Sequence, residues 1–129
     1  MSNLKIIQIN SILFFVAWTI IMLLGADFPP PIGFIWVILL IGALDLIQYK
    51  YLQKFLPLLR KRKNNLFIKN LLFFLTGGIV VSLLLLASRY KITLEMGMSS
   101  IIIWITILTL VGAIYGACFW FFNLLLIKI

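Results

Sequence analysis

The stretch LFIKNLLFFLTGGIVVSLLLLAS, residues 66–88, carries one charged side chain, Lys69, and is otherwise almost entirely apolar. A helix needs roughly 18 or more apolar residues to cross a bilayer, so this segment is long enough to span a membrane. Three further stretches have the same character, at residues 6–25, 32–50 and 99–127. The sequence therefore predicts an all-α integral membrane protein, a bundle of four transmembrane helices forming one domain over residues 1–129.

The composition agrees with this class. Of the 129 residues, 64% are hydrophobic and 11% are charged, which leaves too little polar surface for a soluble globular domain. The chain has no His, one Cys and three Asp or Glu residues. These are too few ligands for a transition-metal site and too few acids and bases for a catalytic centre. We therefore expect the protein to have no enzymatic activity and no cofactor.

The placement of positive charge predicts the topology. Lys and Arg residues, which produce a net charge of +8, crowd around the connection between the second and third stretches, whereas the first connection carries only Asp27. Short cytoplasmic loops hold the excess of positive charge, so both termini are predicted to be cytoplasmic. The basic residues of this region are Lys50, Lys54, Arg60, Lys61, Arg62, Lys63 and Lys69.

The run Arg60, Lys61, Arg62 and Lys63 has two interpretations. It fixes the topology, or it also binds anionic lipid headgroups. A nucleic-acid partner is not expected, because no folded platform with exposed aromatic residues accompanies the charge.

The second helix is expected to continue past residue 50 as an amphipathic segment over residues 51–59 at the inner membrane interface. Lys50 and Lys54 share one side of this segment, and Pro57 is expected to bend it. Its other side carries Leu52, Phe55, Leu56 and Leu59. Residues 89–98 are expected to form an exposed polar loop.

Asp45 is the acidic residue that falls well inside a predicted membrane helix. It lies roughly 20 Å along the helix axis from Ile32. A carboxylate at that depth costs several kcal/mol unless it is protonated, hydrated or paired. Lys69, at a similar depth in the next helix, is the predicted partner. The pair is either a structural lock between two helices or part of a proton, cation or substrate site.

Other polar residues are predicted near the same inner level. They either line a shallow vestibule that opens to the cytoplasm or lie where helix ends reach water. The candidate intramembrane polar site comprises Asp45, Lys69, Gln8, Asn10, Gln48, Asn70 and Asn123.

Small residues mark the expected helix contacts. Gly112 and Gly116 form a GxxxG motif in the fourth stretch, and small residues allow helix backbones to approach closely in lipid. These faces either meet within one chain or form a dimer through the fourth helix. The candidate packing residues are Gly77, Gly78, Gly112, Ala113, Gly116 and Ala117.

Three functions are compatible with this sequence. The first is a non-catalytic accessory, inhibitory or immunity-type protein that packs against another membrane protein. The second is a small oligomeric transporter or flippase with its site around Asp45. The third is a channel or holin-like pore former, which ranks last because the outer halves of the helices lack a polar stripe. The abundance of Ile, Leu, Asn and Lys indicates an AT-rich bacterial genome, and therefore a plasma membrane protein.

Overall fold

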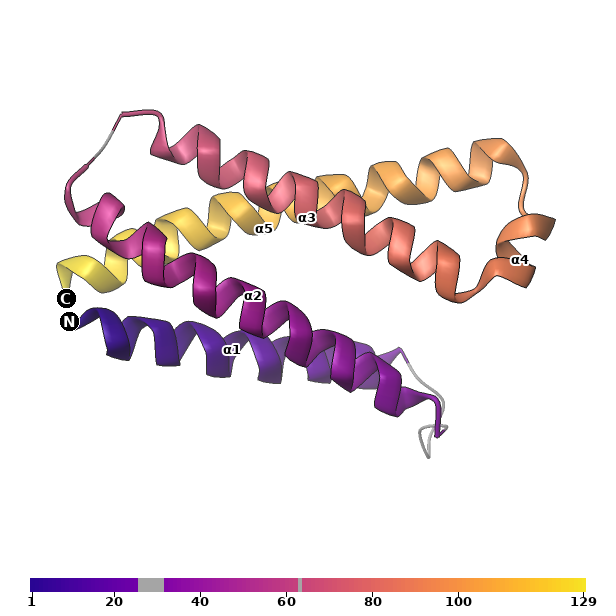
Figure 1. Cartoon of the computed structure of the whole chain (residues 1–129), viewed down its shortest axis with the longest axis horizontal. Helices are drawn as coiled ribbons and strands as arrows, with labels where there is room; N and C mark the ends of the chain where they lie inside the picture. Colours follow the sequence, from indigo (N-terminus) through magenta and orange to yellow (C-terminus); the bar gives the residue numbers. More distant parts are fainter. Residues whose placement is uncertain (26–31, 63) are drawn as a thin grey trace. The chain divides into compact units, whose positions relative to one another are not determined.

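The structure is a computed structural model that describes residues 1–25, 32–62 and 64–129, and these residues form helices without any strand (Figure 1). Four helices are long and apolar enough to cross a membrane, which confirms the prediction of four membrane-length helices. The helices are α1 (Asn3–Leu24), α2 (Phe34–Arg60), α3 (Leu66–Ser88), α4 (Tyr90–Glu95) and α5 (Met98–Lys128).

The helix boundaries follow from local chemistry. The side chain of Ser2 caps α1, because its hydroxyl oxygen accepts a hydrogen bond from the Lys5 N–H at 3.4 Å. α3 begins and ends at the residues predicted. α2 continues past residue 50 to Arg60, and Pro57 lies within its last turn. A proline so close to a helix end removes one backbone hydrogen bond without breaking the rest of the helix.

The extension of α2 has one buried and one exposed side. Leu52, Phe55, Leu56 and Leu59, the apolar side predicted for it, are all buried, whereas Lys50 and Lys54 are exposed. The position of this extension at the membrane interface stays a prediction.

The short helix α4 was not predicted, and the expectation of an irregular loop over residues 89–98 was wrong there. The Thr93 hydroxyl donates to the carbonyl oxygens of Leu86 at 2.8 Å and Arg89 at 3.0 Å. Carbonyls in the last turn of a helix have no partner within that helix, so this hydroxyl ties α4 to the end of α3. Tyr90 and Glu95 are exposed, in agreement with an exposed connection.

The described chain divides into two compact units. The first contains α1, α2 and residues Leu126–Ile129, and the second contains α3, α4 and α5 as far as Leu125. The prediction that the whole chain forms one domain requires these two units to pack together, and it stays a prediction. The first connection, with Asp27, and Lys63 of the basic run lie outside the described residues.

In the first unit, α1 and α2 pack as an antiparallel hairpin (Figure 1). The Arg60 guanidinium closes its open end, since its Nε donates to the Asn3 side-chain oxygen at 2.7 Å and its Nη2 donates to the Met1 carbonyl. The chain therefore brings the beginning of α1 and the end of α2 to the same end of the hairpin. This antiparallel arrangement is what two consecutive membrane spans require.

In the second unit, α3 and α5 run antiparallel and approach closely. Aromatic rings pack beside the contact, with centroid distances of 4.7 Å between Phe74 and Phe119 and 5.1 Å between Phe74 and Tyr115. Aromatic pairs of this geometry add to the dispersion energy of helix packing. In lipid, such packing replaces the hydrophobic effect as the force between helices.

Candidate functional site

The side chain of Asp45 contacts Ser11 across the first hairpin. The Ser11 hydroxyl, on α1, donates to Asp45 Oδ2, on α2, at 2.5 Å. The other carboxyl oxygen, Oδ1, is buried and has no hydrogen-bond partner among the described residues. A carboxyl group in apolar surroundings depends strongly on its few polar contacts, so this bond is important for the hairpin.

Ser11 was not predicted as the partner of Asp45, although the sequence contains a signal for this pairing. Ser11 lies 13 residues before Leu24, and Asp45 lies 11 residues after Phe34. At 1.5 Å per residue, both side chains are therefore about 16–20 Å from the shared end of the hairpin. Counting residues outward from the connection between α1 and α2 therefore predicts that Ser11 and Asp45 lie at nearly the same height along the hairpin.

The other predicted polar residues of the first unit differ in exposure. Asn10 is buried and donates to the Ile6 carbonyl one turn earlier, at 2.8 Å. Gln48 is buried one turn after Asp45, whereas Gln8 is exposed. The structure thus brings Ser11 and Asp45 together and turns Gln8 away from the interior of the hairpin.

Three predicted polar residues belong to the second unit. Lys69 is exposed, and its pairing with Asp45 stays a prediction. Asn70 is buried and donates to the Gly116 carbonyl at 2.8 Å, so it joins α3 to α5. Asn123 is buried and donates to the Phe119 carbonyl of its own helix at 2.9 Å. Asn70 therefore has a packing role within this unit that the polar-site interpretation did not include.

The predicted small residues contribute unequally to the contact between α3 and α5. A Cβ atom on Gly78 would lie 2.6 Å from the Leu108 carbonyl oxygen, and one on Gly112 would lie 2.5 Å from the Phe74 carbonyl oxygen. On Gly116 it would lie 2.9 Å from the Phe74 Cβ. On Gly77 it would meet nothing within 4 Å. Gly78, Gly112 and Gly116 thus form the close approach, and Gly77 lies outside it.

The remaining small residues flank this contact. Ala113 and Ala117 are partly exposed beside the glycines of α5. Ser82, one turn after Gly78, is buried and its hydroxyl donates to the Ile79 carbonyl of its own helix at 2.7 Å. Asn70, Phe74, Gly78 and Ser82 recur at intervals of four, which places them on one face of α3.

Asn70 offers a test of this contact that depends on a hydrogen bond. Asn70→Ala is expected to destabilise the protein by about 1–2 kcal/mol, because it removes the bond to Gly116 and leaves a cavity. Ser82→Ala is the matched control on the same face and is expected to cost less than about 0.5 kcal/mol, since its bond is local. Reversible unfolding in mixed detergent micelles measures both changes. Equal effects would contradict a role for Asn70 in joining α3 to α5.

The predicted basic run does not act as one group in the structure. Arg60 bonds to Asn3 and Met1, as described above, whereas Lys61 and Arg62 are exposed. Arg62 has a left-handed backbone with a φ of 48°, and Asn65, before α3, has a φ of 62°. Asn tolerates this conformation, so the chain enters α3 with little strain at Asn65.

The arrangement of these residues supports binding and packing. Within residues 1–25, 32–62 and 64–129, no three His, Cys, Asp or Glu residues lie together in a way that could hold a metal ion. Asp45 with Ser11 could bind a proton or a small cation. No protein-family model, no curated protein and no solved structure matches the chain.

Proposed function

We propose that the protein is a non-catalytic membrane protein that acts as an accessory, inhibitory or immunity-type partner by packing its helices against another membrane protein. A bacterial plasma membrane with both termini in the cytoplasm is part of this proposal. The observation that carries it is the division of α5 into two faces. Glycine contacts bind one face to α3, and large apolar side chains cover the opposite face.

The outer face of α5 has the spacing of a helix-packing surface. Ile107, Ile114 and Phe121 recur at intervals of seven, as do Ile103 and Leu110. These five side chains are between 49% and 64% exposed in the structure. Apolar residues at intervals of three, four and seven form a stripe along one side of a helix. This stripe is suited to contact a helix of a partner protein within the bilayer.

Site-specific cross-linking tests this proposal in native membranes. A photoreactive residue at Ile114 is expected to link the protein to one partner, and a C-terminal tag should recover that partner in stoichiometric amount after gentle solubilisation. The same residue at Leu84, which is exposed on α3 away from α5, is the control and should react with lipid. A homogeneous assembly that contains only this chain, or equal cross-linking from both positions, would contradict the proposal.

A small transporter or flippase is the second candidate, and the carboxyl group of Asp45 favours it. Oδ1 has no hydrogen-bond partner among the described residues, so it is available to a proton or cation. In proteoliposomes, Asp45→Asn should abolish any proton or monovalent cation flux while the amount of inserted protein is unchanged. An accessory protein should show no such flux in either form.

A further inference from the structure

Three exposed lysines form a row along the last part of α2. Lys50, Lys54 and Lys61 are all exposed. Lys61 is the residue after the helix, and its backbone angles, φ −78° and ψ −1°, are still in the right-handed helical region. The direction of its side chain around the helix axis can therefore be estimated in the same way as for Lys50 and Lys54. At 3.6 residues per turn, the three side chains leave the helix within about 40° of one another. The row therefore presents three cations on one side of α2.

The row lies opposite the side of α2 that is packed. Leu52, Phe55, Leu56 and Leu59 are all at most 3% exposed, and by the same count they point away from the lysines. Asp45, the acidic residue of α2, also points away from the row and accepts the Ser11 hydroxyl. No acidic side chain of α2 therefore neutralises the row.

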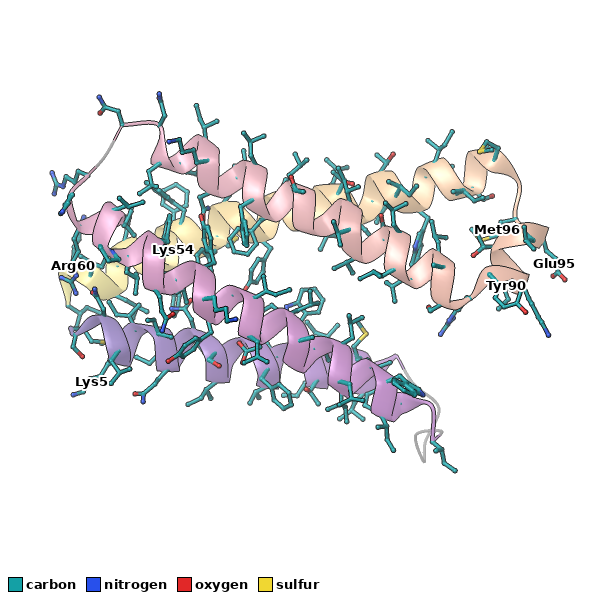
Figure 2. All side chains as sticks on the ribbon, in the orientation of Figure 1. Lys5, Lys54, Arg60, Tyr90, Glu95 and Met96 are labelled. Carbon is teal, nitrogen blue, oxygen red and sulfur yellow. The ribbon has the colours of Figure 1, made fainter. Side chains whose placement is uncertain are left out.

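Arg60 is separated from this row by its contacts. Its guanidinium donates to Asn3 and Met1 on the α1 side of the hairpin. Figure 2 labels Arg60 and Lys54 on the last turns of α2 and Lys5 on the first turns of α1, at the same end of the hairpin. The basic residues at the end of α2 thus divide into one that closes the hairpin and three that face outward.

The length of α2 is sufficient to bring part of this row to the depth of the lipid headgroups. Measured from Phe34 at 1.5 Å per residue, Lys50 is about 24 Å along α2, Lys54 about 30 Å and Lys61 about 40 Å. The hydrocarbon core is about 30 Å thick, so with Phe34 at its outer edge Lys50 lies about 6 Å inside the inner edge, Lys54 lies at that edge and Lys61 lies about 10 Å beyond it. A lysine at the edge can extend its ammonium group to the phosphates.

We propose that Lys50, Lys54 and Lys61 form a binding site for the headgroup of an anionic phospholipid. A signal for topology needs only the number of positive charges, whereas these three also share one side of the helix, and their long side chains can extend the ammonium groups toward one headgroup layer. Each lysine near an anionic membrane surface strengthens binding by about fivefold at physiological salt. This site is independent of the partner-binding face on α5.

Lipid binding to the purified full chain tests the site. The wild-type protein in a zwitterionic detergent is titrated with phosphatidylglycerol, phosphatidylcholine or inorganic phosphate, and native mass spectrometry counts the bound molecules. The variant Lys50→Gln/Lys54→Gln/Lys61→Gln is compared with a control of equal charge, Lys5→Gln/Lys91→Gln/Lys128→Gln. Both variants keep Arg60 and Arg62 as signals for topology.

The expected result is that phosphatidylglycerol binds the wild type and the control equally, and binds the row variant at least about tenfold more weakly. Equal weakening in both variants would overturn the proposal, because it would reduce the interaction to net charge. Displacement of the lipid by inorganic phosphate at similar concentration would also overturn it. If the row variant does not insert into the membrane, the wild type alone decides. Equal binding of phosphatidylcholine and phosphatidylglycerol then overturns the proposal, and at least a tenfold preference for phosphatidylglycerol supports it.

Discussion

Gly78→Ala is expected to destabilise the protein by about 2 kcal/mol, whereas the same substitution at the neighbouring Gly77 is expected to be neutral or slightly stabilising. The added Cβ on Gly78 would lie 2.6 Å from the Leu108 carbonyl oxygen and 3.1 Å from the Thr109 Cα. Both are backbone atoms of α5, which cannot move without moving the helix. The Cβ on Gly77 would meet no atom within 4 Å.

This pair of variants separates the steric effect of the close contact between α3 and α5 from the other effects of adding a methyl group. The two glycines are adjacent in α3, so membrane depth and helix propensity are nearly the same at both positions. Unfolding by sodium dodecyl sulfate in mixed micelles, followed by tryptophan fluorescence, measures the difference, with Trp104 and Trp120 on α5 as reporters. Equal free energies of unfolding would show that α3 and α5 do not meet at Gly78.

The helices were predictable because each depends on a local run of apolar residues. The run over residues 66–88 coincides with α3, and residues 99–127 differ from α5 by one residue at each end. The extension of α2 beyond residue 50 was anticipated from the spacing of Leu52, Phe55, Leu56 and Leu59. α4 was missed because six residues are too few for a hydrophobic period, and its attachment depends on one hydroxyl, that of Thr93.

Pairs of residues were harder to predict than helices. The GxxxG motif indicated a close contact through Gly112 and Gly116, but left open whether a second copy or another helix of the same chain would fill it. The structure places α3 there, so a dimer through these glycines would have to displace α3. The choice between Gly77 and Gly78 depends on the rotation of α3 about its axis. A stretch that is apolar on all sides does not specify this rotation.

The polar site was incompletely predicted for a related reason. Opposite charge and similar depth predict Lys69 as the partner of Asp45, and this pairing stays a prediction, whereas the partner that the first unit supplies is the uncharged Ser11. In an apolar medium, a hydroxyl group can satisfy a carboxyl oxygen at much lower desolvation cost than an ammonium group. Within the first unit, depth along α1 and α2 indicates Ser11, which carries no charge and therefore gives no signal in a search for opposite charge.

A double-mutant cycle of Ser11→Ala and Asp45→Asn is expected to reveal a coupling energy of about 1–2 kcal/mol. Ser11→Ala alone should destabilise the protein by about 2 kcal/mol, because it removes the hydrogen bond to a carboxyl oxygen that has few other partners. In the Asp45→Asn background the same change should cost only about 0.6 kcal/mol, the usual value for a neutral bond between membrane helices. The same micellar unfolding assay measures all four proteins, and additive effects would contradict a Ser11 bond that is stronger to the carboxyl group of Asp45 than to an amide.

The cycle also separates the two candidate functions. An Asp45 that serves only the hairpin should tolerate Asn, because the amide oxygen can still accept the Ser11 hydroxyl and no charge remains to be desolvated. The protein should then keep its stability, its abundance and its association with a partner. A transporter requires a group that gains and loses a proton or cation, which the Asn amide cannot do. Full stability of Asp45→Asn together with loss of ion flux would therefore assign Asp45 to transport, and full stability with unchanged partner binding would assign it to the hairpin.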